Sequence, residues 1–370
     1  MIFSGQYGAV LTIDLHAIAS NFRFLKSMSS SAECAAVVKC NAYGLGIKQV
    51  GQTLLREGCR AFFVASSSEA LSLKRALLEI HKDFEIYILN GFERDFPEIY
   101  DTSIAPVLNS LEDIRRWVEL SKSKRELLSA IANFDTGMNR LGLDKSETAE
   151  ILGSSLSPDH SKISILMSHL ACSEDPEHRL NHEQFRAFSS IVAKSKNRFR
   201  YSLANSGGVF LGKKYHFDLV RPGAALFGIG NFANRYTNLR QVVTLKAKIL
   251  QTRSIDAGVT VGYGATQAVN RKSRLATVAL GYGDGIFRGL TNAGFGYLSG
   301  YPAQIIGRVS MDLVTLDVTD IPQSLSQPGY WVEFIGEHQT PDSLAQRAGT
   351  IGYEVLTALG SRYERIYLGR

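Results

Sequence analysis

A lysine stands at the end of an apolar stretch near the N-terminus. Residues 35–38 (Ala-Ala-Val-Val) suit a strand that is buried on both faces, and Lys39 follows them directly. Burying an ammonium group is costly unless it is paired or loses its proton, and a desolvated lysine with a lowered pKa is the form that makes a Schiff base with an aldehyde. A lysine that bends out to water is the commoner case. Tyr43, followed by Gly-Leu-Gly, favours the chemical alternative because a phenol at the same edge can donate to a phosphate.

An arginine and a histidine follow two other predicted strands. Arg140 lies in a glycine-bounded loop, residues 135–142 (Asp-Thr-Gly-Met-Asn-Arg-Leu-Gly). An arginine in such a loop can hold a carboxylate through two parallel hydrogen bonds, although a surface salt bridge is the more common use. His169 follows the next strand, where a lone histidine is more often a packing residue. Both residues are therefore candidates whose roles depend on their surroundings.

Two short segments have the composition of anion-binding sites. Asn205 and Ser206 are expected to open a helix, where a hydroxyl group and backbone N–H groups can bind an anion, and a plain N-cap is the alternative. In the second segment Pro222 is expected at a first helical position, with free amides at Gly223 and Ala224. Two such segments on successive units are typical of the phosphate site of (β/α)8 barrels.

Strands and helices alternate about eight times in the first two thirds of the chain, which predicts a parallel sheet with helices outside it. Eight such units predict an α/β fold of the (β/α)8 TIM-barrel type, in which the chemistry takes place at the C-terminal ends of the strands. The predicted strands are 9–15, 35–38, 61–65, 85–89, 104–108, 127–133, 163–167, 201–204 and 217–220, and the predicted helices are 16–28, 47–57, one capped at Ser66, 110–120 and 177–194.

The pattern changes near Asn238, and we expect two domains. Residues 1–237 form the predicted barrel and residues 238–370 a C-terminal mainly-β domain, which strand 9–15 could also join. Tyr263 stands between two glycines, as expected of an aromatic residue at a hairpin tip. The strands predicted in this domain are 242–251, 274–280, 304–307, 313–318 and 331–335.

The composition is that of an ordinary globular protein. The 370 residues are 45% hydrophobic and 21% charged, and the net charge of +6 comes from scattered Lys and Arg, so we expect no nucleic-acid partner. No apolar run approaches the roughly 20 residues that a membrane helix needs, and residues 1–8 show no signal-peptide pattern. The four cysteines have neither metal-ligand spacing nor a disulfide pattern. We therefore expect a cytoplasmic protein with no metal site and no membrane partner.

The segments that contain Lys39 and Arg140 resemble motifs of the alanine racemases, and the resemblance continues over nearly the whole chain. It implies a fold-type III barrel enzyme that binds pyridoxal 5′-phosphate (PLP) through Lys39 and the substrate carboxylate through Arg140. In this family Tyr353 would hydrogen-bond the phosphate, and His169 would help to position a catalytic tyrosine. The full set of residues implied in cofactor binding is Lys39, Tyr43, His169, Asn205, Ser206, Arg221, Gly223, Ala224 and Tyr353.

The resemblance also implies two bases and a homodimer. Inverting a stereocentre needs one base on each face of Cα, and Lys39 would serve D-alanine while Tyr263, reaching into the partner's active site, would serve L-alanine. Cations such as Arg221, acting through His169, would favour the phenolate of Tyr263. The implied function is the interconversion of L- and D-alanine, which supplies D-alanine for peptidoglycan.

Three residues of the second domain complete the implied site. The backbone amide of Met311 would touch the substrate, and Tyr282 and Asp312 would line its entry. In the barrel, Arg221 would point at the pyridine nitrogen of PLP. Because a guanidinium does not give up its proton, the ring nitrogen would stay unprotonated and the ring would be a weaker electron sink, which favours reprotonation at Cα over transamination. An Arg221→Glu variant should therefore show more side reactions.

One position departs from the pattern of the family. Many members carry a carbamylated lysine seven residues before the carboxylate-binding arginine, and this chain has Asn133 there. An anion such as chloride could supply the missing charge, and a broader amino acid specificity is an alternative. Two further alternatives are a PLP-dependent decarboxylase, disfavoured by Arg221 and by the lack of any cysteine after Cys172, and a non-catalytic PLP-binding barrel, disfavoured by the second domain.

Overall fold

The computed structural model describes residues 8–93, 95, 99–124, 126–153, 162–196, 198–230, 232, 236 and 238–369. The chain divides into two compact units. The barrel unit consists of Ile18–Gly228 and Phe232–Arg240, and the sheet unit consists of Met1–Ala17, Ile229–Asn231 and Gln241–Arg370. Residues 1–7, on which the expectation about a signal peptide rests, lie outside the described residues. Among the residues described, none of the helices has the length and apolar character that crossing a membrane requires.

A seven-stranded parallel sheet forms the core of the barrel unit, in the order β3-β4-β5-β6-β7-β8-β9. Most side chains of these strands are fully buried, as expected of strands that are covered on both faces. The strands are β3 (Ala36–Val37), β4 (Ala61–Val64), β5 (Glu85–Ile88), β6 (Ile104–Leu108), β7 (Ala130–Asn133), β8 (Ile163–Met167) and β9 (Arg200–Ser202).

The eighth position of the barrel is filled by β10 (Leu219–Val220), which closes the ring. It pairs in parallel with β2 (Glu33–Cys34), the segment just before β3. Backbone hydrogen bonds of 2.9 Å join this part of the chain to Ala35 on one side and to Ala204, after β9, on the other. The predicted (β/α)8 barrel is therefore confirmed, with its first strand divided into β2 and β3.

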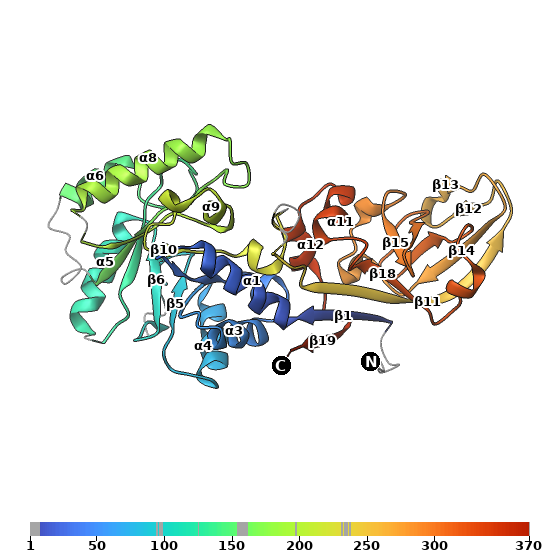
Figure 1. Ribbon diagram of the computed structural model, residues 1–370, viewed down its shortest axis with the longest axis horizontal. Coiled ribbons are helices and arrows are strands. Elements are labelled where there is room, and N and C mark those ends of the chain that lie inside the picture. The colour runs from blue at the N-terminus through green and yellow to red at the C-terminus, as the bar shows by residue number, and fades with distance from the viewer. Residues whose placement is uncertain are drawn as a thin grey trace. The chain divides into compact units, whose positions relative to one another are not determined.

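Helices follow the strands and lie outside them in the barrel unit (Figure 1). Ser66 and Ser110 cap two of them, because each hydroxyl accepts a hydrogen bond from an amide of the first turn, a contact that stabilises a helix by about 1 kcal/mol. Helix α6 was not expected from the sequence. The helices are α1 (Leu15–Met28), α3 (Ile47–Arg56), α4 (Ser67–Leu78), α5 (Leu111–Ser123), α6 (Lys145–Gly153), α8 (Arg179–Lys194) and the short α9 (Ser206–Phe210).

An eight-stranded sheet forms the core of the sheet unit (Figure 1). Its main order is β16-β15-β18-β11-β1-β19, and β14 pairs with both β11 and β17. The first strand of the chain, β1 (Ala9–Asp14), is antiparallel to β11 and parallel to β19. The predicted mainly-β part is confirmed. The other strands are β11 (Val243–Ile255), β14 (Ser273–Val278), β15 (Phe295–Leu298), β16 (Tyr301–Gln304), β17 (Val314–Asp317), β18 (Trp331–Ile335) and β19 (Glu364–Leu368).

Smaller elements complete the sheet unit. A hairpin of β12 (Thr260–Val261) and β13 (Gln267–Ala268) carries the 3-10 turn η4 (Tyr263–Ala265) at its tip. Two helices, α11 (Pro341–Ala348) and α12 (Gly352–Ala358), follow β18.

The structure moves the limits of several predicted strands. The run 35–38 contributes only the two residues of β3, and the run 127–133 contributes only the four residues of β7. The prediction for 304–307 was wrong, because the paired residues lie earlier, in β16, and Ile305 makes only an isolated bridge. A run of apolar residues indicates that a segment is buried, but it does not show which of its residues pair with a neighbouring strand. It therefore predicts the ends of strands poorly.

Candidate active site

Four basic side chains meet at the end of the barrel where the strands terminate. Lys39 follows β3, His169 follows β8 and Arg221 follows β10, and parallel strands in a closed ring bring these ends to one rim. Arg140 lies in the loop after β7, and its charge acts on both Lys39 and His169. The structure therefore brings these four predicted residues together.

The chain turns left-handed immediately after Lys39. Residues 40–43 have φ angles of 54° to 57°, a conformation that costs about 1–2 kcal/mol for each residue other than glycine. Two acceptors hold the turn: Asn41 Oδ1 accepts from the Ile47 amide at 2.8 Å, and Glu69 Oε1 accepts from the Asn41 amide at 3.2 Å. The sequence predicted a turn here but gave no sign of its hand.

The Lys39 amine is easier to deprotonate than an ordinary lysine. Burial lowers the pKa of Lys39 and the charge of Arg140 lowers it further, while Cys40 and Glu69 act in the opposite direction. A larger fraction of the amine is therefore uncharged near neutral pH. The uncharged amine is the nucleophile that attacks an aldehyde.

Tyr43 and Gly223 approach each other so closely that only glycine fits at the second position. A Cβ atom at Gly223 would overlap the Tyr43 hydroxyl oxygen. The Tyr43 ring packs on Phe227, with ring centroids 4.7 Å apart, and burial raises the pKa of the phenol. Tyr43 is therefore neutral, and its hydroxyl oxygen occupies the space that a side chain at position 223 would need.

Ser206 accepts a hydrogen bond from the Gly223 amide, which the sequence led us to expect to be free. The Gly223 N–H donates to Ser206 Oγ at 2.9 Å, and the Ala225 N–H donates to the same oxygen at 3.2 Å. The expectation of a free amide at Gly223 was therefore wrong, whereas no acceptor for the Ala224 amide occurs among the described residues. Ser206 is buried and accepts two hydrogen bonds, so its own hydroxyl hydrogen is left to donate.

The two predicted helix starts have different outcomes. Asn205 is the N-cap of α9: its Oδ1 accepts from the Gly208 amide at 3.0 Å and from the Ser173 hydroxyl at 2.6 Å. A contribution of Asn205 to cofactor binding stays a prediction. Pro222 does not occupy a first helical position, because the 3-10 helix η3 (Ala224–Phe227) begins two residues later.

Arg221 is buried with neutral partners. Its guanidinium donates to Ser202 Oγ and, at 2.7 Å, to the Ser168 carbonyl oxygen, and it lies 5.9 Å from the centroid of the Phe63 ring. Burial lowers the pKa of Arg221 to about 9, with no contribution from a described carboxylate. The group still carries its proton at neutral pH. A buried cation without an anionic partner is unfavourable, so this position suits a ligand that presents a lone pair.

His169 is a neutral imidazole beside this cation. Arg221 Nη2 lies 3.5 Å from His169 Nδ1, and because a guanidinium only donates, we assign the imidazole hydrogen to Nε2. Burial lowers the pKa of His169 to about 3, and the charges of Arg221, Arg140 and Lys39 act in the same direction. His169 can therefore donate from Nε2 without carrying a charge.

The first residue of the Arg140 loop fixes the path of the loop. Asp135 Oδ1 accepts hydrogen bonds from the three successive amides of residues 137–139, at 2.8 to 3.2 Å. Gly137 has a φ of +136°, which other residues rarely adopt. Arg140 itself is exposed. The guanidinium is thus presented to solvent from a loop whose backbone is tied down.

Asn133 ends β7 and is buried among amides. Its Nδ2 donates to Asn109 Oδ1 at 2.8 Å, and Asn109 donates in turn to the Leu89 carbonyl oxygen. These groups supply no negative charge. The predicted anion beside Asn133 therefore stays a prediction.

In the sheet unit, Tyr263 lies at the tip of the β12–β13 hairpin. Its side chain is 73% exposed. The flanking Gly262 and Gly264 both have φ of +75°, and a Cβ atom at Gly264 would lie 2.9 Å from the Arg308 guanidinium. Glycine is therefore required for the close path of the hairpin tip, and the phenol is available to another surface.

Two loops that carry further predicted residues lie side by side. The Tyr282 N–H donates to the Ser310 carbonyl oxygen, and the Gly283 N–H donates to the Met311 carbonyl oxygen, both at 2.9 Å. Tyr282 and Met311 are largely exposed. These two predicted residues therefore share one surface of the sheet unit.

Arg362, which sequence reasoning missed, ties these loops to the end of the chain. Its guanidinium binds the buried Asp284 through two hydrogen bonds of 2.7 and 2.9 Å and Asp312 through one of 2.6 Å. Two parallel bonds to one carboxylate fix orientation as well as distance. Asp312 thus lies on the same surface, while Tyr353 lies on α12 and its predicted role stays open to test.

Sequence reasoning also missed polar residues behind the barrel rim. Thr136 Oγ1 lies 2.7 Å from Ser168 Oγ, and Gln184 donates to the His169 carbonyl oxygen at 2.8 Å. The position of Gln184 was the available signal, since a glutamine four residues before the buried Phe188 falls on the apolar face of its helix.

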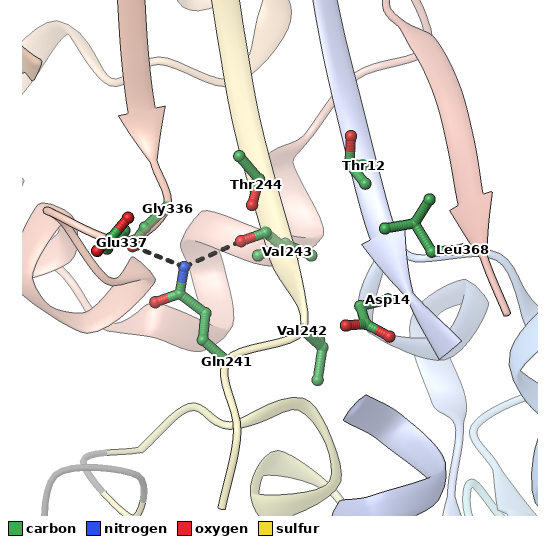
Figure 2. Close-up of a pocket in the computed structure, with 9 residues that line it drawn as sticks. All are labelled: Thr12, Asp14, Gln241, Val242, Val243, Thr244, Gly336, Glu337 and Leu368. Atoms are coloured by element: carbon green, nitrogen blue, oxygen red, sulfur yellow. Dashed lines mark hydrogen bonds between the residues drawn. The ribbon is translucent and has the colours of Figure 1, made fainter. Parts of the chain in front are cut away.

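A groove of about 370 Å³ in the sheet unit contains none of the predicted site residues (Figure 2). The Gln241 amide crosses it and donates to the carbonyl oxygens of Val243 and Gly336, at 2.9 and 3.0 Å. In the described part of the chain, no cluster of His, Cys, Asp and Glu could hold a metal ion. The residues that line the groove are Thr12, Asp14, Gln241, Val242, Val243, Thr244, Gly336, Glu337 and Leu368.

Comparison with known proteins gives one consistent result. The family models for the N-terminal and C-terminal domains of alanine racemase match residues 13–231 and 242–367. An alanine racemase of Rickettsia bellii is 45% identical over 90% of this chain and 80% of its own length, and one of Rickettsia akari is 42% identical over 97% and 98%. The crystal structure of alanine racemase from Bartonella henselae with covalently bound pyridoxal phosphate has a TM-score of 0.93 and 42% identity, covering 98% of this chain and 99% of that one. The chain therefore belongs to the alanine racemase family.

Proposed function

We propose that the protein interconverts L-alanine and D-alanine, with PLP as its cofactor. Membership of the family and the similarity to a structure with covalently bound pyridoxal phosphate support this proposal. The observation that carries it is the gathering of Lys39, Arg140 and Arg221 at one rim of the barrel, beside a neutral His169. Such an excess of positive charge suits a ligand that bears both a phosphate and a carboxylate.

The residues present fit the phosphate of PLP. The lack of a side chain at Gly223 lets the Tyr43 hydroxyl lie close to the backbone there. The Tyr43 phenol, held neutral by burial, and the hydroxyl hydrogen of Ser206 would both donate to phosphate oxygens there. The hydrogen bond from Tyr353 to the phosphate, which the resemblance implies, stays a prediction.

Arg221 fits the pyridine nitrogen of the same cofactor. When bound, PLP supplies an electron sink that makes the α-proton of an amino acid acidic. Arg221 would donate to the ring nitrogen without transferring its proton, because the pKa of about 9 keeps the guanidinium charged at neutral pH. The sink is thereby weakened, which favours simple return of a proton to Cα over other outcomes.

Lys39 would hold the cofactor through its amine and act as one base. The lowered pKa of Lys39 keeps part of the amine free to accept a proton from Cα near neutral pH. Arg140 would hold the substrate carboxylate through two parallel hydrogen bonds and so present the α-proton to Lys39.

The second base would come from another copy of the chain. Tyr263 is 73% exposed at the tip of a hairpin, and we propose that the partner subunit's Tyr263 approaches the opposite face of Cα in a homodimer. His169, with its hydrogen on Nε2, would donate to that phenol and favour the phenolate. Met311, Tyr282 and Asp312 would belong to the same contributed surface.

Asn133 supports a second candidate function, which is the racemisation of a wider range of amino acids. In place of an acidic group, the chain has an amide at the end of β7, so a bound chloride would have to orient Arg140. With a loosely held Arg140, amino acids larger than alanine become plausible substrates. Racemisation of a panel of L-amino acids, measured with and without chloride, separates the two candidates. Racemisation of alanine alone would favour the first candidate, and racemisation of larger amino acids would favour the second. Activity that does not respond to chloride would count against the bound anion.

The decisive test is the equilibration of the two alanine enantiomers by the purified PLP-loaded protein, followed by chiral chromatography. We expect L- and D-alanine to reach equal amounts from either side. A Tyr263→Phe variant should retain the yellow colour of bound PLP and lose at least about 100-fold in rate, the usual worth of a general base. Full activity of this variant would refute the two-base proposal, and a wild type that binds PLP but does not racemise amino acids would leave a non-catalytic PLP-binding protein.

The proposed product defines a cellular role. D-alanine is a precursor of peptidoglycan, and we propose that the protein supplies it. The cytoplasmic location and the homodimer expected from the sequence stay predictions.

A further inference from the structure

A buried glutamine and a threonine link the two loops that carry Arg140 and His169. Gln184 is completely buried on α8. Its Nε2 donates to the His169 carbonyl oxygen at 2.8 Å and to Thr136 Oγ1 at 3.3 Å, and its Oε1 accepts from the Ala171 amide at 2.9 Å. Burying an amide is unfavourable unless its donors and acceptor are paired. All of these partners lie on the two rim loops, so the side chain acts as a brace between them.

Thr136 is the point where the brace meets the Arg140 loop. It directly follows Asp135, whose carboxylate fixes the path of that loop. Because Gln184 donates to Thr136 Oγ1, the threonine hydroxyl is free to donate to Ser168 Oγ, 2.7 Å away. The carbonyl oxygen of Ser168 in turn accepts from Arg221. Ser168 therefore links the Arg140 loop to Arg221 through two hydrogen bonds, one to its side chain and one to its backbone.

The loop also rests on the same helix. A Cβ atom at Gly137 would lie 3.4 Å from Leu180 Cδ1 and 3.7 Å from Gln184 Cγ. The backbone of the Arg140 loop thus packs against the turn of α8 that presents Gln184. The position of the loop is set both by this packing and by the Thr136 hydroxyl.

We propose that Thr136 and Gln184 form a positioning pair that sets the placement of Arg140 relative to the His169–Arg221 side of the site. This inference rests on the proposed function, in which Arg140 holds the substrate carboxylate and Arg221 the cofactor ring. Neither residue of the pair is assigned to hold the substrate or the cofactor. The effect of the pair is to keep the two ligand-binding loops in register, so that Arg140 holds the carboxylate equally well in the ground state and in the transition state.

The proposed role of the pair predicts a change in KM without a change in kcat. An interaction that places the carboxylate equally in the ground state and in the transition state changes KM and leaves kcat nearly unchanged. Removing the Thr136 hydroxyl while keeping the shape of the side chain should loosen the Arg140 loop. The Arg221 side should remain in place, because Arg221 keeps its bonds to Ser202 and to the Ser168 carbonyl oxygen.

The experiment compares three variants of the PLP-loaded enzyme. Thr136→Val removes the hydroxyl, Thr136→Ser keeps it, and Thr53→Val is the matched control, because its hydroxyl bonds only within α3 to the Gln49 carbonyl oxygen. We expect Thr136→Val to raise KM for alanine roughly fivefold, the fold-change that one lost hydrogen bond corresponds to. The values for kcat, for PLP affinity and for the cofactor absorbance should stay near wild type. Thr136→Ser should recover most of the KM, and Thr53→Val should leave KM unchanged.

Two results would overturn the proposal: an unchanged KM in Thr136→Val, or equal defects in Thr136→Val and Thr136→Ser, which would show that the hydroxyl group is not the feature that matters. A parallel loss of PLP and of thermal stability in Thr136→Val would also contradict it. The affinity for propionate, which has the carboxylate of alanine without its amino group, is measured from the cofactor fluorescence. If the wild type fails to racemise alanine, the proposed function falls, while a propionate affinity weakened only in Thr136→Val still supports the coupling.

Discussion

At the scale of single residues, the rim of the barrel is a place where protonation states are set by burial and by neighbouring charge. Lys39 and His169 both have lowered pKa values, and burial is the first cause for each. Desolvation disfavours the charged form, and the nearby Arg140 adds repulsion. The result is a site in which Arg221 keeps its charge while the lysine and the histidine can exist in their neutral forms.

The neutral state of His169 leads to a pH prediction. The pKa of about 3 lies below the ordinary value for histidine, so the unfolded chain takes up a proton at a higher pH than the folded protein does. The stability contributed by neutral His169 is present above about pH 6.5 and is lost as the pH falls from there towards 3. In NMR spectra of protein labelled with 15N-histidine, the imidazole signal that disappears in a His169→Gln variant should therefore not titrate between pH 5 and 8. A midpoint near pH 6.5 for that signal would refute this assignment.

At the scale of elements, the left-handed turn after Lys39 is the least ordinary feature of the barrel. Four successive residues with positive φ follow the lysine, and the surrounding structure must outweigh their strain. Asn41 and Glu69 provide that support through hydrogen bonds to the backbone. The turn takes the chain sharply away from β3, which leaves Lys39 at the end of the strand.

A glycine in this turn should act differently from a glycine in an ordinary helix. Cys40 is exposed and has a φ of 57°, so Cys40→Gly relieves strain at little cost in contacts. We expect the free energy of unfolding to rise by up to about 1 kcal/mol. The control is Ser72→Gly on the exposed side of α4, which should lower it by about 0.5 kcal/mol. The shift of the urea midpoint measures both, and a loss in Cys40→Gly as large as that in Ser72→Gly would argue against strain in the turn.

The parts that the sequence predicted well are those that depend on local pattern. Alternating apolar strands and amphipathic helices indicated the barrel, and the rule that chemistry lies at strand ends singled out Lys39 and Arg221. The parts that it missed depend on distant partners. The Gly223 amide is occupied because Ser206, 17 residues earlier, folds back onto it. The brace by Gln184 likewise joins residues 48 positions apart, at Thr136.

At the scale of the whole molecule, the proposed site needs two chains, and this can be tested by mixing. Lys39→Ala and Tyr263→Phe homodimers should each be inactive. After joint refolding, random pairing makes half of the dimers mixed, and each mixed dimer has one intact site, so about a quarter of the wild-type activity should return. If Tyr263 acted within its own chain, no mixed dimer would contain an intact site and no activity would return. Size-exclusion chromatography of the mixture checks that dimers form.

The place of β1 has a consequence for how the protein is made. This strand is synthesised long before its partners β11 and β19, which lie at Val243–Ile255 and Glu364–Leu368. At a synthesis rate of about 5–20 residues per second, roughly 10 to 50 seconds pass before β11 emerges. During that interval Ala-Val-Leu-Thr-Ile-Asp is an apolar strand with two unsatisfied edges, a state that invites aggregation. We therefore expect that β1 needs shielding, by a chaperone or by the growing polypeptide, until β11 has emerged.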